Sequence, residues 1–230
     1  MIPEPSAISK RTRLVLFDLD GTLVDTAEDL AMAVNRCRTR RGLQPTPPPE
    51  LRPWTSHGAR GLIQRAFGLE PDDAGYDELR AELLDNYSQA LCVHSHLYEG
   101  IEQALAAIEA SDRIWGVVTN KPARFTHPLL RALGLEQRAS CVVSGDTVAR
   151  PKPDPAPIRH ALDTCAVPAP DCVYIGDDVR DVQAGRAAGV RTIAAAYGYL
   201  GGAGDVASWG ADFVIHQPLE LLDCLGRSPA

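Results

Sequence analysis

The 230-residue sequence has no long apolar run, no excess of positive charge and no repeated segment. No run approaches the ~18 consecutive apolar residues that a membrane-spanning helix needs, and the N-terminal residues lack the basic-then-apolar order of a secretory signal. Lysine and arginine number 23 against 30 aspartates and glutamates, a formal charge of −7. Such a surface repels nucleic-acid phosphates and anionic lipid. These absences predict an acidic globular protein with neither a nucleic-acid partner nor a membrane segment.

Paired cysteine motifs are also absent. The six cysteines form no CxxC pair and have no histidine at zinc-binding spacing; they are Cys37, Cys92, Cys141, Cys165, Cys172 and Cys224. We therefore expect buried free thiols in a reducing cytoplasm, in place of disulfides or metal ligands. Nothing in the sequence indicates an obligate protein partner, and residues 1–12 are predicted to form a flexible tail.

What the sequence does contain is a series of short apolar runs that end in polar or glycine residues. The runs are 14–17, 114–118, 141–143, 172–175, 191–195 and 212–215. Patterns of helical length lie between them, at about 101–111, 122–134, 155–165 and 179–188. Runs this short and continuous are typical of strands buried on both faces. Their alternation with helices predicts an α/β fold with a doubly wound, Rossmann-like parallel sheet.

The interval 27–95 breaks this alternation. It contains no buried-strand run and is predicted to form helices at 27–41, 59–67 and 77–92, separated by proline-containing segments. A helical insert after the first strand, followed by a return to the α/β pattern, predicts a cap over a core. The expected boundaries are 13–26 and 96–230 for the core and 27–95 for the helical cap.

The most specific motif follows the first apolar run, where Asp18, Leu19 and Asp20 precede Gly21 and Thr22. Because side chains alternate along an extended strand, the two aspartates can share one side while Leu19 points away. Ligands of open α/β sheets bind beyond the carboxyl ends of the strands, where this pair falls. Two carboxylates this close suit one nucleophile and metal ligand beside one proton donor. On this motif alone, a surface Asp-Gly turn is an equal alternative.

Two further sites follow later runs. Thr119 and Asn120 come directly after 114–118 and offer a hydroxyl and N–H groups to a phosphoryl oxygen, although a strand-to-helix cap is the alternative. Lys152 stands between prolines that fix its backbone, which suits stabilisation of charge at a transferring phosphoryl group. A solvated lysine is the alternative there.

The last site is acidic, with Asp177, Asp178 and Asp181 after the run 172–175. Asp177 can supply an oxygen ligand to Mg²⁺, and the other two can act around that ligand or through water. Capping of a helix N-terminus explains one or two of these acids more readily than three. All four sites occur in order at the ends of predicted parallel strands, which favours one shared site.

Together, the DxDGT motif, the later threonine, the lysine and the GDDxxxD-type acids resemble the haloacid dehalogenase superfamily of phosphotransferases. The resemblance extends from about residue 13 to residue 225. It implies a phosphatase that hydrolyses a small phosphate ester. In it, Asp18 attacks phosphorus to give an aspartyl-phosphate, and Asp20 protonates the leaving alcohol and then deprotonates water. Thr119 and Lys152 bind the phosphoryl oxygens.

The same resemblance implies Mg²⁺ as the cofactor, held by the Asp18 carboxylate, the Asp20 backbone carbonyl and Asp177. The residues that it places around these groups are Thr22, Asp178 and Asp181. Asp20 also separates the chain from the true dehalogenases of the superfamily, which lack that acid. Its presence favours phosphate-ester chemistry.

Within the superfamily, the sequence resembles the phosphoglycolate phosphatase branch. Several stretches are similar to members that act on N-acetylmuramic acid 6-phosphate: 58–60, 93–95, 114–122, 197–199 and 209–212. This implies that ester as the substrate, with 2-phosphoglycolate as the alternative. Both carry a carboxylate, which Arg60 is a candidate to bind, although a solvated arginine fits its sequence position equally well. Asn120 and His57 are further candidates for substrate contact, and His57 fits a loop role as well.

Two other functions share much of this chemistry. A sugar phosphomutase of the same fold would use every catalytic residue and would require a bisphosphate activator. A signalling receiver module also uses an acidic Mg²⁺ site, a phosphorylated aspartate, a threonine and a lysine. A receiver, however, needs neither the helical insert nor the DxDGT order, so the sequence favours the hydrolase.

Overall fold

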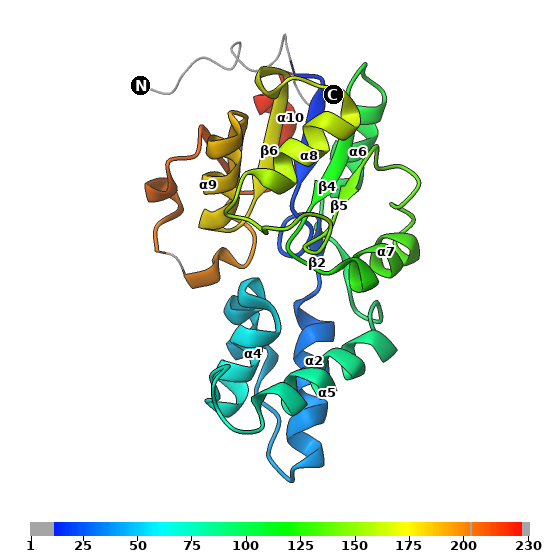
Figure 1. The fold of residues 1–230 in the computed structure, drawn as a ribbon. Coiled ribbons are helices and arrows are strands. Elements are labelled where there is room, and N and C mark those ends of the chain that lie inside the picture. The colour runs from blue at the N-terminus through cyan, green and yellow to red at the C-terminus, as the bar shows by residue number, and fades with distance from the viewer. Residues whose placement is uncertain (1–11, 203, 227–230) are drawn as a thin grey trace.

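A computed structural model of the chain describes residues 12–202 and 204–226. Its centre is a six-stranded parallel sheet with the strand order β5-β4-β1-β6-β7-β8 (Figure 1). The strands are β1 (Leu14–Phe17), β4 (Ile114–Val118), β5 (Val142–Val143), β6 (Cys172–Gly176), β7 (Arg191–Ala195) and β8 (Phe213–Ile215). β1 lies between β4 and β6, so the direction of winding reverses at β1. Such a reversal creates a crevice at the carboxyl ends of the strands.

Helices cover both faces of this sheet. They are α6 (Ile101–Glu109), α7 (Ala123–Ala132), α8 (Ala156–Cys165), α9 (Val179–Ala188) and α10 (Glu220–Cys224). Side chains along β1 point alternately to the two faces of the sheet. Val15 and Phe17 pack with α6, α7 and α10 on one face. Leu14 and Leu16 pack with α8 and α9 on the other. Burial on both faces explains why the strand is apolar at every position. The predicted α/β class and doubly wound sheet are confirmed.

A second group of helices, which we call the helical unit, follows β1 in sequence. It consists of α2 (Ala27–Arg40), α3 (Pro48–Leu51), the 3₁₀ turn η1 (Arg52–His57), α4 (Gly58–Phe67) and α5 (Tyr76–Gln89). These elements enclose an apolar core of their own, to which α7 contributes Phe125. Figure 1 shows the unit beyond the carboxyl end of the sheet. That it acts as a cap, with boundaries at 27 and 95, stays a prediction.

Two short strands join the helical unit to the sheet. β2 (Val24–Asp25) and β3 (His96–Leu97) pair antiparallel. The chain therefore leaves the sheet for the helical unit and returns to the sheet at the same place. Neither strand was predicted, because two residues are too short to show a periodic pattern. Among described residues the structure also adds the 3₁₀ turns η2 (Ala169–Asp171), η3 (Leu200–Gly202) and η4 (Val206–Trp209).

Three sequence expectations about the chain as a whole are resolved only in part. The predicted tail lies outside the described residues except for Thr12, which is buried and so belongs to the packed core. All six cysteines lie in the described region and none forms a disulfide; Cys37, Cys141 and Cys172 are buried and the others half-buried. No helix within 12–202 and 204–226 combines the length and apolar character needed to cross a bilayer.

Candidate active site

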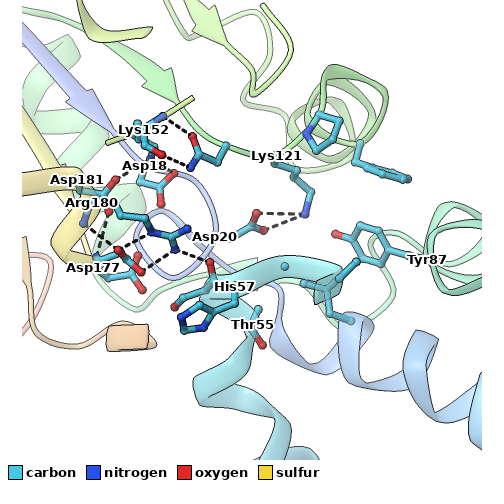
Figure 2. A pocket seen from close by; sticks show the side chains of 18 of the residues that line it. Asp18, Asp20, Thr55, His57, Tyr87, Lys121, Lys152, Asp177, Arg180 and Asp181 are labelled. Atoms are coloured by element: carbon cyan, nitrogen blue, oxygen red, sulfur yellow. Dashed lines mark hydrogen bonds and ion pairs between the residues drawn. The ribbon is translucent and has the colours of Figure 1, made fainter. Parts of the chain in front are cut away.

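A cavity of about 210 Å³ lies between the carboxyl ends of the central strands and the helical unit. Figure 2 shows the side chains that line it. The core supplies Asp18, Asp20, Asn120, Lys121, Pro122, Phe125, Lys152, Asp177, Asp178, Arg180 and Asp181. The helical unit supplies Leu30, Thr55, Ser56, His57, Gly58, Ala59, Leu84 and Tyr87. Segments more than a hundred residues apart in the sequence therefore meet at one pocket.

Asp18 stands at the end of β1 beside a buried ammonium group. The Lys152 Nζ lies 2.9 Å from Asp18 Oδ1 and 2.7 Å from Asp181 Oδ1. The same Nζ donates to the Tyr174 hydroxyl (2.7 Å) and the backbone carbonyl of Val118 (3.1 Å). Burial lowers the pKa of Lys152, but the two carboxylates outweigh that effect and leave it above its ordinary value. The lysine is therefore held charged at a fixed position.

Burial acts in the opposite direction on the neighbouring acids. It raises the pKa of Asp18 to about 6, even though Lys152 pulls that value down. It also raises the pKa of Asp177 well above the ordinary range, and the nearby Asp18 carboxylate adds to the rise. Both carboxylates would therefore be stabilised by a further positive charge in the pocket.

The orientation of Asp177 is fixed from two sides. Its Oδ1 accepts a hydrogen bond from the Thr22 hydroxyl (2.8 Å), and its Oδ2 accepts one from the Tyr199 backbone N–H (2.8 Å). Two glycines make room for this carboxylate, because a Cβ on Gly21 would lie 2.2 Å from Asp177 Oδ2 and one on Gly198 2.2 Å from Asp177 Cβ. Thr22 therefore supports Asp177, in line with its expected place in the site.

The carboxylates fit a divalent cation. Asp18, Asp177 and Asp181 each bring an oxygen within 4.8 Å of the others. Mg²⁺ prefers carboxylate oxygens and water, and it offsets the repulsion between buried acids. Asp181 already accepts from Lys152, Tyr174 and the Asp178 backbone N–H. Asp18 and Asp177 are therefore better placed than Asp181 to bind a metal directly.

Asp20 lies apart from the other acids and has different partners. Its Oδ1 accepts from the Thr26 hydroxyl (2.6 Å), and both of its oxygens contact the Lys121 ammonium, at 3.0 and 3.2 Å. The sequence did not predict this position of Lys121. A lysine beside the Thr119 signal carries no mark that it will turn back toward an aspartate 101 residues earlier.

The side chains of the two residues after β4 form hydrogen bonds to the backbone around the pocket. The Thr119 hydroxyl accepts from the Lys121 backbone N–H (3.1 Å) and is buried. The Asn120 side chain donates to the Lys152 carbonyl (3.0 Å) and accepts from the Lys152 N–H (2.9 Å). Asn120 was expected to contact substrate, and it lines the pocket. Both ends of its amide are used to fix the backbone of Lys152, and its contact with substrate stays a prediction.

Asp178 was expected to act around Asp177, and it lines the same pocket. Its part in the site stays a prediction. It caps α9 by accepting from the Arg180 backbone N–H (2.9 Å), and its carboxylate pairs with the Arg180 side chain at 2.8 Å. Burial raises the pKa of Asp178, but the bonds from Arg180 outweigh it and leave that pKa below its ordinary value. Arg180 reaches on to the Ser56 carbonyl (2.6 Å) in the helical unit. Helix capping therefore accounts for Asp178, and Asp181 completes the capping box.

Arg60, the expected ligand for a substrate carboxylate, does not line the pocket. Its side chain is 65% exposed and pairs with Glu70 at 3.1 Å. Arg60 lies in the first turn of α4, which directs its side chain outward. His57, one turn earlier, does line the pocket. Its part in substrate binding stays a prediction.

Comparisons with known proteins agree with this geometry. A family model described as haloacid dehalogenase-like hydrolase matches residues 15–195. The chain is 44% identical to an N-acetylmuramic acid 6-phosphate phosphatase of Pseudomonas aeruginosa, covering 95% of this chain and 98% of the relative. It is 42% identical to a phosphoglycolate phosphatase of Xanthomonas campestris, covering 91% and 94%. The crystal structure of a predicted phosphoglycolate phosphatase from Haemophilus somnus superposes with a TM-score of 0.82 at 28% identity, covering 93% and 97%.

The family match spans the first strand to the seventh and includes the DxDGT motif, Lys152 and Asp177. The relatives cover nearly the whole chain, so the helical unit is part of the similarity as well as the sheet. They confirm the expected class of enzyme, a phosphoric monoester hydrolase. The chain belongs to the haloacid dehalogenase-like hydrolase family.

Proposed function

We propose that the chain is a Mg²⁺-dependent phosphomonoesterase that works through an aspartyl-phosphate at Asp18. The observation that carries this proposal is the meeting of Asp18, Lys152 and Asp177 at the carboxyl edge of the sheet. A nucleophile, a fixed cation and a second carboxylate are the groups that phosphoryl transfer to a carboxylate needs.

Asp18 and Asp177 would hold Mg²⁺, together with the Asp20 backbone carbonyl. When bound, the ion would neutralise charge between an anionic nucleophile and an anionic substrate. Thr22 and the Tyr199 N–H keep Asp177 oriented toward that place. Because outer hydrogen bonds fix the orientation of metal ligands, these two groups support the site without touching substrate.

The chemistry itself falls to three residues. An Asp18 oxygen forms a bond to phosphorus while the bond from phosphorus to the ester oxygen breaks, and Asp20 gives its proton to the departing alcohol. Water then attacks phosphorus, Asp20 takes a proton from it, and Asp18 is released with inorganic phosphate. Lys152 holds phosphoryl oxygens throughout, with Thr119 beside it, and Asp181 keeps Lys152 in place.

For the substrate we propose N-acetylmuramic acid 6-phosphate, and 2-phosphoglycolate as the second candidate. The first is favoured by relatives in two Pseudomonas species, at 44% and 42% identity over almost their full length. The second is favoured by the Xanthomonas relative at 42%. Both esters are small and carry a carboxylate. We propose in addition that the helical unit acts as a cap over the ester.

A comparison of kcat/KM values tests the choice of substrate. With Mg²⁺ present, purified protein is assayed on N-acetylmuramic acid 6-phosphate, 2-phosphoglycolate and simple sugar phosphates. The first ester is expected to be turned over with the highest kcat/KM. A clear preference for 2-phosphoglycolate would replace it with the second candidate, and no hydrolysis of any phosphate ester would reject the phosphatase itself.

A further inference from the structure

Lys121 is a buried cation that the proposed chemistry does not use. It lies between β4 and α7, and its side chain is only 6% exposed. Its Nζ contacts both oxygens of Asp20 and stands 4.6 Å from the centre of the Tyr87 ring in α5. Removing a charge from water is costly unless the charge is paired, and Asp20 is the carboxylate paired with Lys121 here. Because Lys121 also lines the pocket, an anionic group of a substrate can reach the same ammonium.

The backbone of Lys121 is fixed on both sides. Its N–H donates to the Thr119 hydroxyl (3.1 Å), and its carbonyl accepts from the Thr126 hydroxyl (3.0 Å) and the Gly145 N–H (2.9 Å). A lysine side chain is normally flexible, but this one starts from a rigid loop and ends between a carboxylate and an aromatic ring. Its ammonium is thus held at one place in the wall of the pocket.

The pocket has two ends with different chemistry. In Figure 2, Lys152, Asp18 and Asp177 lie at one end and Lys121 and Tyr87 at the other, with Asp20 between them. The phosphoryl group belongs to the first end under the proposed function. The rest of the substrate extends from Asp20, which serves the leaving oxygen, toward Lys121. Apolar side chains of the same wall can pack against its carbon skeleton: Leu30, Leu84 and Phe125.

The other two cations that line the pocket are more fully engaged. Lys152 contacts two carboxylates, a hydroxyl and a carbonyl. Arg180 holds both oxygens of Asp178 and the Ser56 carbonyl. Lys121 has a single carboxylate partner in the described structure, Asp20, and that group cannot keep both oxygens on Lys121 while it serves a leaving oxygen. An ammonium has three donors, so a second carboxylate can take the place that Asp20 leaves.

We propose that Lys121 binds the carboxylate of the substrate and so selects carboxylate-bearing phosphate esters. The inference rests on the proposed function and gives Lys121 the part that sequence analysis assigned to Arg60. A charge-assisted hydrogen bond in a buried site is strong enough to discriminate between esters that differ only in this group.

The test uses two sugar phosphates, one that carries a carboxylate and one that does not. N-acetylmuramic acid 6-phosphate carries a lactyl ether that ends in a carboxylate, and N-acetylglucosamine 6-phosphate has a hydroxyl in place of that whole ether. The wild-type protein is expected to prefer the first. Lys121→Met should lower kcat/KM for the first ester about 10- to 100-fold more than for the second. Any effect of the substitution on Asp20 acts on both esters alike, so the ratio of the two values reports recognition of the lactyl group, and its dependence on the charge at residue 121 assigns that recognition to the carboxylate.

Two further variants make the result specific. Lys121→Arg keeps the charge and should keep most of the preference, and Lys121→Gln replaces the methionine variant if that one does not fold. Arg60→Ala is the matched control, because Arg60 is a cation of the helical unit outside the pocket. It should leave the preference unchanged. A preference that survives loss of the Lys121 charge, or that disappears in Arg60→Ala, overturns the inference.

The outcome also separates this inference from the proposed function. If the wild-type protein prefers 2-phosphoglycolate, the same ratio is measured against ethyl phosphate, which lacks the carboxylate, and Lys121 is tested on that pair. If the wild-type protein hydrolyses phosphate esters but prefers neither of the two carboxylate-bearing esters, the phosphatase proposal stands. The substrate proposal and the inference about Lys121 are then both wrong.

Discussion

Asp18, a half-buried carboxylate, joins a proposed catalytic role to a cost in stability. Burial raises its pKa to about 6, whereas Lys152 at 2.9 Å favours the ionised form without fully restoring it. The proposed nucleophile is therefore ionised near neutral pH at a cost in folding free energy. A metal ion beside it would recover that cost, which links catalysis and stability at one residue.

This link predicts that Asp18→Asn is more stable than wild type in the absence of divalent metal. The folded pKa of Asp18, about 6, exceeds the ordinary 3.8. The wild type therefore loses stability as pH rises from about 4 to 6, and the amide does not. In EDTA at pH 7 the variant should gain about 1–3 kcal/mol in unfolding free energy, measured in urea.

The control for this prediction is pH itself. Well below the ordinary pKa of 3.8 the carboxyl is protonated in both the folded and the unfolded state, so the two proteins should unfold with similar free energies. Added Mg²⁺ should raise the midpoint of thermal unfolding of the wild type more than that of the variant. A wild type that is the more stable protein at pH 7 in EDTA would contradict the raised pKa.

Gly198 permits a second test at this scale. A Cβ there would lie 2.2 Å from Asp177 Cβ and 2.4 Å from the Gly21 carbonyl. Gly198→Ala should displace Asp177 and weaken Mg²⁺ activation by about 10- to 100-fold, read from the metal dependence of kcat/KM. Gly185→Ala is the control, because Gly185 lies in α9 outside the pocket lining and its Cβ would meet a methyl group of Thr192 in β7. If both variants show the same dependence of kcat/KM on Mg²⁺ concentration, Asp177 is not a metal ligand.

The sequence predicted the site residues that belong to a recognisable motif with a fixed order along the chain. Asp18, Asp20 and Lys152 line the pocket as expected. It did not predict Lys121 or the Tyr199 N–H, since one depends on where a long side chain turns and the other on a backbone group that any residue carries. It placed Arg60 on the wrong side of α4, because periodicity predicts a helix but not which residues face the pocket.

Among the elements, the sheet was the most predictable part and the connection to the helical unit the least. Apolar runs such as 114–118 and 191–195 became β4 and β7 with the expected bounds. The β2–β3 ribbon depends instead on contacts between segments about 70 residues apart. Asp29 completes that connection as a buried acceptor, and nothing in the sequence around it marks this role.

Asp29 should be essential to the return of the chain into the core. Its carboxylate accepts from the N–H groups of Val93 (3.1 Å), His94 (3.0 Å) and Ser95 (2.8 Å), and from the Ser95 hydroxyl (2.6 Å). Asp29→Ala would leave these donors without a partner and should cost about 2–4 kcal/mol in urea unfolding. Asp29→Asn keeps one acceptor oxygen and should cost less. Equal stability of all three proteins would contradict this role.

The described molecule has two parts that face each other across the pocket. Apolar clusters pack against the sheet on both of its faces, and another lies within the helical unit. The sequence predicted a helical insert, because the strand pattern stops there; its division from the core at residues 27 and 95 stays a prediction. It could not predict the contacts across the seam, such as Arg180 to Ser56 and Arg52 to Asp25 at 2.7 Å, since each joins residues distant in sequence.

The Arg180 contact gives a prediction for the motion of the two parts. Arg180→Lys keeps a positive charge beside Asp178 but loses the guanidinium group, whose Nη2 donates to both Asp178 and the Ser56 carbonyl. KM should rise roughly 10-fold. Amide exchange should accelerate over residues 52–61 while the sheet is unaffected. Arg65→Lys, which alters a surface pair with Glu50 in the same helical unit, should change neither quantity. Unchanged exchange in Arg180→Lys would mean that the contact does not hold the unit in place.

The most direct measurement is the search for phosphate on Asp18 during turnover. A substrate with labelled phosphorus is mixed with protein and Mg²⁺, the reaction is stopped in acid within the first turnover, and the peptides are sequenced. Label should appear on the peptide that contains Asp18. It should be absent from Asp18→Asn, whose activity should fall by at least about 1000-fold. Full release of phosphate without label on Asp18, or substantial turnover by the variant, would show that Asp18 is not the nucleophile.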